Sequence, residues 1–487
     1  LEYSYGFSPE LVQEWDWPEV FSAQEDILRY ANHVADRFNL RECMRFNTRV
    51  VSVEYQDAAN LWRLTTEAGE TFTAPYCVMA TGCLSVPITP DIAGADSFAG
   101  EVYHTGRWPK DPVDLAGKRV GIIGTGSSGV QAIPELAKQA GHLHVFQRTP
   151  VYTVPANRKR MRPDVQQEFR EHYQEIRELQ QNNAGGVSNF RPRPSVQRVQ
   201  REGGEKAIKT RILEFTPEEL KARIAQRGLQ ELLTFRDVNT DLQANEIANQ
   251  AYRETVAEMI NDPQTAERLL PKDYGLGCKR QVIDRDYYAT FNRDNVTLVD
   301  VRETPIESIT PTGIETTADH YDLDVLIYAT GFDAMTGAML RANIAGREGR
   351  KLTDKWRYGP VAYLGLQMRG FPNLFTVTGP GSPSVLCNML VAIEQHVNWI
   401  GDCIAYLRNN GVQTIEPLDE SEQEWIAHVN EVADGTMYTV PSCNSWYLGA
   451  NIPGKPRIFM PYIGGYPRYR ERCERETDNG YPGFQLA

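Results

Sequence analysis

The segment Lys118-Arg119-Val120-Gly121-Ile122-Ile123-Gly124-Thr125-Gly126-Ser127-Ser128-Gly129 decides the fold of this chain. Its first half is a short apolar run that predicts a buried strand, and its second half has the glycine spacing GxGxxG. In such a turn the first glycine allows a tight bend, the second lets the backbone approach a pyrophosphate, and the third lets a helix pack closely on the strand. The turn residues predicted to bind this cofactor are Gly124, Thr125, Gly126, Ser127, Ser128 and Gly129.

The sequence on either side supplies the elements that such a turn requires. A helix is predicted from Ser128 to about Gln139, and His142–Phe146 predicts the next strand. This strand–turn–helix–strand order is much more specific for a dinucleotide site than the glycines alone. The phosphates are expected at the helix N-terminus, where free N–H groups and the positive end of the helix dipole meet them. Gln131, in the first turn of the helix, is also predicted to contact the cofactor.

The end of the second strand distinguishes between the two nicotinamide cofactors. NAD sites commonly place Asp or Glu about 20 residues past the turn, where it binds the ribose 2′-hydroxyl. Here the sequence reads Val145-Phe146-Gln147-Arg148-Thr149 and contains no acidic residue. A guanidinium matches a 2′-phosphate in charge and geometry, so the sequence favours NADPH, with Arg148 and Thr149 in the site. The alternative is that Arg148 is an ordinary solvent-exposed side chain.

Length and composition limit the possible classes of protein. The chain has 487 residues, 41% of them hydrophobic, which predicts two or three folded domains. The net charge of −13 argues against a nucleic-acid partner or an anionic membrane surface. No apolar run approaches the roughly 20 residues of a membrane span. The eight cysteines are scattered without a CxxC pair, which predicts free thiols in a reducing cytosol.

Hydrophobic periodicity predicts the remaining elements. Three short strands joined by turns predict an antiparallel meander, and a long helix is expected from near Ser384 to about Asn409. Residues 155–275 are rich in Glu, Gln, Arg, Lys and Leu and predict a helical insertion, with an exposed loop at 191–194. The predicted strands are Val50–Val53, Leu61–Thr65 and Thr71–Phe72 in the meander, followed by Tyr76–Ala80, Val296–Val299, Tyr321–Ala329 and Leu374–Val377.

The tripeptide Ala-Thr-Gly follows a buried strand twice, at Ala80–Gly82 and Ala329–Gly331. It resembles the crossing point between the flavin and nicotinamide domains of two-dinucleotide flavoproteins. We therefore expect an α/β fold with two Rossmann-like dinucleotide-binding domains: residues 1–111 and 311–487 for FAD, and 112–310 for NADPH with the insertion at about 155–275. Only one glycine turn is present, so the other is expected N-terminal to Leu1, with the FAD domain incomplete in this sequence.

The stretch Phe98–Pro109 resembles the FxGxxxHxxxWP fingerprint of the Baeyer–Villiger monooxygenases. Every specified position is occupied, by Phe98, Gly100, His104, Trp108 and Pro109. The resemblance extends over nearly the whole chain, as far as the segment at 445–455, and is greatest for the phenylacetone and steroid monooxygenase branch. It implies that NADPH reduces FAD, that reduced FAD binds O2 as a C4a-peroxide, and that this species converts a small-molecule ketone to an ester or lactone. The scattered cysteines predict a cytoplasmic location.

Two other functions remain open at this point. One is oxygenation of amines or sulfides through the same peroxyflavin. The Trp108-Pro109 ending argues against it, and so does Arg280, which matches the catalytic arginine of the Baeyer–Villiger family. The other is a non-catalytic NADP-binding module, if the chain truly begins at Leu1. The sequence does not identify the ketone or the oligomeric state.

The resemblance also implies roles for three residues outside the glycine turn. The family's catalytic arginine lies in a Lys-Arg pair, which matches Lys279-Arg280. Arg280 is therefore expected to stabilise the peroxyflavin, since a guanidinium keeps its charge where an ammonium can lose it. Lys279 is expected to contact the 2′-phosphate. Trp446 matches the tryptophan of a mobile loop that closes over the nicotinamide.

Further positions follow from the same resemblance. His104 is expected to couple domain movements, with no role as a proton carrier. Tyr3 and Met389 are predicted to border FAD, Val50 to contact a cofactor, and Leu386 and Met389 to line the ketone pocket. The family's aspartate partner of the catalytic arginine would precede the segment that matches Leu1–Tyr3, and this sequence does not contain it.

Overall fold

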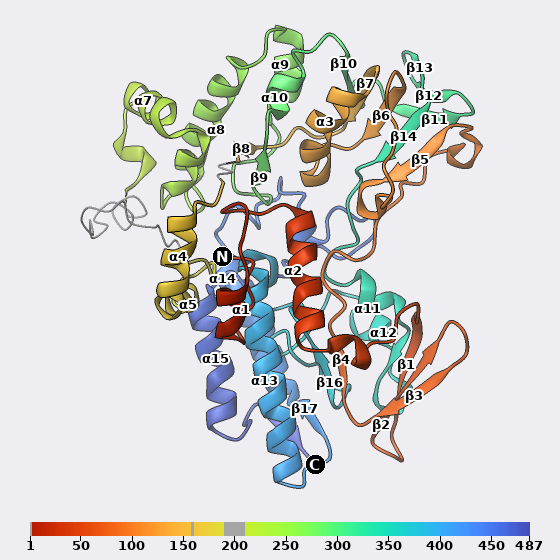
Figure 1. Ribbon diagram of the computed structural model, residues 1–487, viewed down its shortest axis with the longest axis vertical. Helices are drawn as coiled ribbons and strands as arrows, with labels where there is room; N and C mark the ends of the chain where they lie inside the picture. Colours follow the sequence, from red (N-terminus) through yellow and green to blue (C-terminus); the bar gives the residue numbers. More distant parts are fainter. Residues whose placement is uncertain (1, 157–159, 189–209) are drawn as a thin grey trace.

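The glycine turn follows the carboxyl end of the central strand of a five-stranded parallel sheet (Figure 1). The computed structural model describes residues 2–156, 160–188 and 210–487. The strand order is β10-β7-β6-β14-β5. Val120 and Ile122 are fully buried at its centre, as an apolar central strand of a parallel sheet requires. The strands are β5 (Glu101–His104), β6 (Arg119–Ile123), β7 (His142–Gln147), β10 (Val296–Asp300) and β14 (Val325–Tyr328).

The predicted strand–turn–helix–strand unit is confirmed. Strand β6 leads into the glycine turn, α3 (Ser127–Gln139) follows, and β7 pairs in parallel with β6. Gly124 has a φ of 109°, and a Cβ there would lie 2.6 Å from the carbonyl oxygen of Ala329. A Cβ on Gly129 would lie 2.2 Å from the carbonyl oxygen of Gly124. Both positions therefore require glycine for the close packing of helix and strand.

The sheet extends beyond both predicted domain boundaries. Strand β5 lies before residue 112 and β14 lies after residue 310, yet both hydrogen-bond in the sheet of the glycine turn. The predicted strand at 321–329 is also two strands, β13 (His320–Asp322) and β14. The strand is interrupted between them at Asp324, whose carboxylate accepts a hydrogen bond of 2.8 Å from Nη2 of Arg119.

The predicted meander is confirmed as an antiparallel sheet of β1 (Val50–Gln56), β2 (Leu61–Thr66) and β3 (Thr71–Ala74). A separate parallel pair joins β4 (Cys77–Met79) to β16 (Leu374–Thr376). Strands β8 (Thr153–Pro155) and β9 (Val282–Asp284) form another parallel pair. Strands β11 (Ile306–Thr310), β12 (Gly313–Thr316) and β13 form a three-stranded antiparallel sheet, and β17 (Ile415–Pro417) pairs with β18 (Phe484–Leu486). The short β15 (Ile344–Ala345) pairs with β1.

The long helix α13 (Met389–Asn409) begins five residues later than predicted. The side chain of Asn388 caps it by accepting a hydrogen bond of 3.1 Å from the Leu390 amide, and Ser384–Leu386 forms a separate 3₁₀ turn. Helix α15 (Tyr466–Asp478) runs beside α13 in the lower half of Figure 1. The other helices outside the insertion are α1 (Pro9–Glu14), α2 (Gln24–Arg37), α10 (Tyr287–Thr290), α11 (Gly337–Arg341), α12 (Leu352–Lys355) and α14 (Asp419–Ala433).

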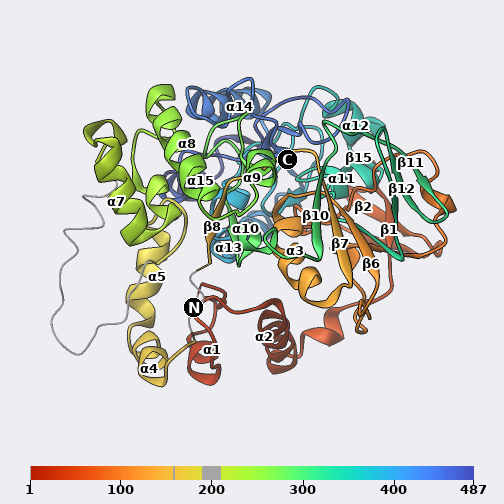
Figure 2. The same ribbon diagram turned by 90° about the horizontal axis from the view of Figure 1, so that it is seen from above.

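The region predicted as a helical insertion forms one side of the molecule (Figure 2). Its helices are α4 (Pro163–Glu171), α5 (Tyr173–Gln181), α7 (Pro217–Arg227), α8 (Leu242–Ala257) and α9 (Pro263–Leu269). The loop predicted at 191–194 lies outside the described residues. Across the described parts of the chain, none of the helices has the length and apolar character needed to cross a membrane.

The prediction that all eight cysteines are free thiols is wrong for one pair. Cys278 and Cys443 form a disulfide with a Cα–Cα distance of 5.6 Å, and neither residue exposes any surface. They are 165 residues apart, so their spacing in the sequence carries no sign of the pairing. The remaining six cysteines are free, as predicted.

Candidate active site

The glycine turn leaves a space that suits a pyrophosphate. Gly126 is exposed, and a Cβ built on it meets no atom within 4 Å. Gly126 also precedes α3 as its N-cap without a capping side chain, so the first N–H groups of the helix are not satisfied by one. Thr125 donates a hydrogen bond of 3.0 Å to the carbonyl oxygen of Thr149, which joins the turn to the end of β7. These features fit a bound dinucleotide.

Two cations lie beside this turn. Arg148 is exposed at the end of β7. The ammonium of Lys279 lies 4.0 Å from the centre of the Tyr274 ring, a cation–π contact. Burial lowers the pKa of Lys279 to about 8, and the positive charge of Arg148 acts in the same direction. The charges of the two residues therefore interact, although 131 positions separate them in the sequence. Because like charges repel, an anion that binds to both would relieve this repulsion.

Arg280 interacts with three segments that are far apart in the sequence. Its Nη1 donates a hydrogen bond of 2.9 Å to the carbonyl oxygen of Val385. Burial raises the pKa of Tyr447, and the charge and hydrogen bonding of Arg280 oppose this shift. Burial likewise raises the pKa of Cys83, which the charge of Arg280 and a hydrogen bond from Ser384 oppose. Arg280 is exposed, and no ion pair found among the described residues includes it.

The neighbours of Arg280 were not predicted from the sequence. Cys83 directly follows the first Ala-Thr-Gly, and Tyr447 directly follows Trp446, so adjacency to a predicted motif is the one signal that the sequence offers. Val385 lies in the 3₁₀ turn before α13. The charge of Arg280 thus meets the first crossing point, the predicted ketone pocket and the predicted nicotinamide loop.

Trp446 is half-buried in a short 3₁₀ turn at 446–448. Its ring centre lies 4.4 Å from that of Tyr447, in an edge-to-face arrangement. The loop is held against the segment after the second Ala-Thr-Gly: Asn451 donates to the carbonyl oxygen of Phe332 at 3.0 Å, and Nζ of Lys455 lies 2.8 Å from Oδ1 of Asp333. The Trp446 loop, residues 443–457, is therefore held at the second crossing point.

The remaining predicted contact residues fall into separate groups. Leu386, Met389 and Trp446 are all half-buried and pack on one large apolar cluster. Tyr3 packs edge-on against Trp17, with 6.2 Å between ring centres, in the N-terminal segment. Val50 begins β1 and packs on the apolar cluster of the meander. The two predicted ketone-pocket residues and Trp446 thus pack on the same apolar cluster, whereas Tyr3 and Val50 belong to other clusters. Gln131 donates at 3.0 Å to the carbonyl oxygen of Ile283, so its amide joins α3 to β9.

Both ring nitrogens of His104 have backbone partners. Nδ1 accepts a hydrogen bond of 2.9 Å from the Gly106 amide, and Nε2 lies 3.0 Å from the carbonyl oxygen of Ile88. Because a carbonyl only accepts, Nε2 carries the proton. Thr330 of the second Ala-Thr-Gly donates to the same carbonyl. His104 thus joins the fingerprint to the second crossing point and has no free nitrogen for proton transfer.

The other fingerprint residues shape the same junction. A Cβ on Gly100 would lie 2.4 Å from the carbonyl oxygen of Asp324, so this position requires glycine. Trp108 is 40% exposed, and its ring centre lies 5.4 Å from that of Tyr103. Phe98 packs on the cluster beneath the three-stranded sheet of β11–β13.

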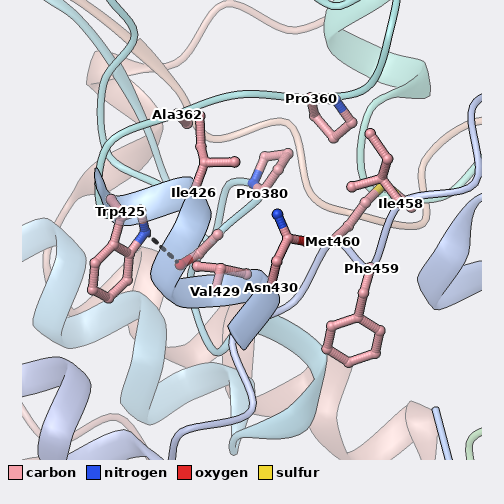
Figure 3. Close-up of a pocket in the computed structure, with 11 residues that line it drawn as sticks. Pro360, Ala362, Pro380, Trp425, Ile426, Val429, Asn430, Ile458, Phe459 and Met460 are labelled. Atoms are coloured by element: carbon pink, nitrogen blue, oxygen red, sulfur yellow. Dashed lines mark hydrogen bonds between the residues drawn. The ribbon is translucent and has the colours of Figure 1, made fainter. Parts of the chain in front are cut away.

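An apolar cavity of about 20 Å³ lies under α14, lined by Trp425, Val429 and Met460 among others (Figure 3). Its volume is enough for about one water molecule and too small for a ketone. None of the predicted cofactor or catalytic residues lines it. The cavity is therefore separate from the candidate active site.

A family model matches the first part of the chain. Residues 8–216 match the model of the pyridine nucleotide-disulphide oxidoreductases. That class agrees with a glycine turn and two Ala-Thr-Gly crossing points that meet at one site.

Individual relatives specify the family. The chain is 39% identical to a 2-oxo-Δ3-4,5,5-trimethylcyclopentenylacetyl-CoA monooxygenase of Pseudomonas putida, over 100% of this chain and 89% of the relative. It is 37% identical to a Baeyer–Villiger monooxygenase of Pseudooceanicola batsensis, over 98% and 85%. It is also 36% identical to the phenazine N-monooxygenase PhzNO1 of Lysobacter antibioticus, over 99% and 86%. The chain belongs to the Baeyer–Villiger monooxygenase family.

Solved structures agree with this assignment. An oxidized steroid monooxygenase bound to NADP superposes with a TM-score of 0.89 at 44% identity, over 100% of this chain and 89% of that one. A complex of OTEMO with FAD and NADP superposes with a TM-score of 0.90 at 38% identity, over 99% and 88%. The predicted α/β fold with two dinucleotide-binding domains is thereby confirmed.

Proposed function

We propose that this protein is a monooxygenase that uses NADPH, FAD and O2 to convert a ketone to an ester or lactone. The observation that carries the proposal is the position of Arg280, whose charge reaches the first crossing point, the turn before α13 and the Trp446 loop. The solved relatives bound to FAD and NADP support both cofactors. FAD, when bound and reduced by NADPH, supplies the activated oxygen.

The residues of this chain bind the cofactors and stabilise charge. The glycine turn and α3 bind the pyrophosphate of NADPH, while Arg148 and Lys279 bind its 2′-phosphate. Trp446 covers the nicotinamide and helps to exclude water. Arg280 stabilises the anionic oxygen that reacts with the ketone carbonyl.

Further residues complete the proposed site. Leu386 and Met389 line the ketone pocket, Tyr3 and Val50 border FAD, and His104 transmits movement between the two domains. We also propose that the NADPH-binding domain comprises residues 112–310 together with β5 and β14, because all five strands form one sheet. The FAD-binding domain comprises the rest of 1–111 and 311–487.

A second candidate function is N-oxygenation of an aromatic heterocycle. The identity to the phenazine N-monooxygenase, 36%, is nearly that to the Baeyer–Villiger relative, 37%, so overall similarity does not separate the two reactions. The electronic demand differs, because a ketone needs a nucleophilic oxygen and an amine an electrophilic one. A fixed cation that stabilises an anionic oxygen favours ketone oxidation.

The test is product analysis of the FAD-loaded protein with NADPH and O2. The substrates are small, cyclic, aryl and steroidal ketones beside phenazine, and products are identified by mass spectrometry. We expect an ester or lactone with one added oxygen from at least one ketone. Formation of an N-oxide without any ester or lactone would overturn the proposal.

A further inference from the structure

The disulfide between Cys278 and Cys443 joins two segments of the candidate active site. Cys278 directly precedes Lys279 and Arg280, and Cys443 lies three residues before Trp446. Both cysteines have an exposed fraction of 0%, so the bond lies inside the protein. No other cysteine pair is joined in the described parts of the chain.

Each end of the disulfide is anchored in a different way. On the Cys278 side, the Asn245 amide donates a hydrogen bond of 2.8 Å to the carbonyl oxygen of Leu276. The Gln281 amide donates a hydrogen bond of 2.9 Å to the carbonyl oxygen of Tyr152. These bonds fix the Arg280 segment to the insertion and to the chain before β8. On the Cys443 side, Arg457 reaches back to Asn444 at 2.9 Å and so closes the Trp446 loop on itself.

We propose that the Cys278–Cys443 disulfide positions the Trp446 loop against the Arg280 segment. This proposal rests on the roles given above to Arg280 and Trp446. The loop contacts the second crossing point through Asn451 and Lys455, whereas the bond from Arg457 to Asn444 lies within the loop and does not reach the Arg280 segment. A covalent bond at its Cys443 end holds the loop over the cofactor site beside Lys279. Reduction of the bond therefore loosens the loop and weakens NADP⁺ binding.

The bond forms when two thiols lose two protons and two electrons to an oxidant such as hydrogen peroxide, which becomes two molecules of water. A phosphine or a dithiol returns the two electrons. Because both sulfurs are buried, a reductant reaches them only when the loop opens, which protects the bond in a reducing environment.

The first test counts thiols in the FAD-loaded protein. The protein is denatured without reductant, alkylated with iodoacetamide and weighed by mass spectrometry. We expect six of the eight cysteines to be alkylated, and all eight after reduction with a phosphine. Alkylation of all eight without reductant overturns the proposal.

The second test measures the loop. NADP⁺ affinity and the rate of tryptic cleavage after the exposed Arg457 are compared before and after phosphine treatment. We expect reduction to weaken NADP⁺ binding at least threefold and to speed cleavage at least threefold. The double variant Cys278→Ser/Cys443→Ser should match the reduced protein and not respond to phosphine. Cys403→Ser, which removes a buried free thiol in α13, should behave as the unmodified protein.

Unchanged NADP⁺ affinity and unchanged cleavage after complete reduction overturn the positioning role. If the double variant fails to fold, the phosphine-treated protein still decides the question. Neither readout requires ketone oxidation. An intact, responsive disulfide in a protein that forms no ester would contradict the proposed function alone.

Discussion

Nη1 of Arg280 lies 2.9 Å from the carbonyl oxygen of Val385, in the turn that precedes α13. A backbone carbonyl orients the guanidinium without neutralising it, as a carboxylate would. The full positive charge therefore stays available to an anionic oxygen. This single hydrogen bond also joins the predicted catalytic residue to the turn that carries Leu386.

Arg280→Ala should lower ester formation by about 100-fold or more, because it removes the positive charge that stabilises the anionic oxygen. NADP⁺ binding should be retained, since the glycine turn and Arg148 are untouched. Ester yield is measured by gas chromatography. Arg285→Ala, which removes another exposed arginine five residues away, is the control. Ester yield close to normal in Arg280→Ala would contradict the role given to Arg280.

Arg148→Ala should weaken NADPH binding by about 10- to 100-fold, the loss expected for one hydrogen bond between charged groups. NADH binding should change little, because NADH has no 2′-phosphate. Titration of each cofactor by fluorescence measures the two dissociation constants. Lys138→Ala, which removes a cation from the last turn of α3, should leave both constants unchanged. Equal losses for NADPH and NADH would count against a phosphate contact.

NADP⁺ binding should weaken as the pH rises through about 8. The pKa of Lys279 is lowered to about 8, so its ammonium is charged below that pH and increasingly neutral above it. Loss of the charge removes attraction to the 2′-phosphate, whereas NAD⁺ binding should stay constant over the same range. Lys279→Arg should abolish the pH dependence because the guanidinium stays protonated. A wild-type affinity for NADP⁺ that is flat from pH 7 to 9.5 would be inconsistent with this contact.

Gly124→Ala should lower stability, whereas Gly126→Ala should weaken NADP⁺ binding. At Gly124 the φ of 109° and the carbonyl oxygen 2.6 Å from a Cβ predict a less stable protein. At Gly126 a Cβ meets no protein atom, so stability should be kept while NADP⁺ binding falls, because the methyl group occupies the pyrophosphate space. Thermal unfolding and NADP⁺ titration distinguish the two. Full NADP⁺ affinity in Gly126→Ala would place the pyrophosphate elsewhere.

The free energy of unfolding should fall as the pH drops below 6.5 because of His396. Burial lowers the pKa of His396 to about 3 in the folded protein, so between pH 6.5 and 3 the unfolded chain binds the extra proton. Nδ1 of His396 accepts from the Thr378 amide at 2.9 Å, which also favours the neutral ring. One group of this kind lowers the free energy of unfolding by about 1.4 kcal/mol for each pH unit of acidification between pH 6.5 and pH 3.

Urea unfolding at pH 7 and pH 5 measures this effect. Between pH 7 and pH 5 the free energy of unfolding should fall by about 2 kcal/mol less in His396→Gln than in the unmodified protein. His428→Gln, on the partly exposed face of α14, is the matched control. An unchanged difference in His396→Gln would show that another group is responsible.

The sequence by itself determined the glycine-turn unit, the meander, the helical insertion and the family. Each of these depends on local patterns: glycine spacing, strand alternation, helical composition and a contiguous fingerprint. The same holds for Arg148, whose place at the end of a strand follows from counting along the chain. Three predictions failed: the single strand at 321–329, the start of α13, and eight free cysteines. The first two depend on Asp324 and Asn388, whose side chains end or cap an element through hydrogen bonds from nearby or distant N–H groups.

Only the tertiary structure decided which distant residues meet. It placed β5 and β14 in the sheet of the glycine turn, set Lys279 beside Arg148, and joined Cys278 to Cys443 across 165 residues. It also gave Arg280 the neighbours Val385, Tyr447 and Cys83. Parallel strands and long connections bring such segments together, and no local periodicity records the resulting contacts.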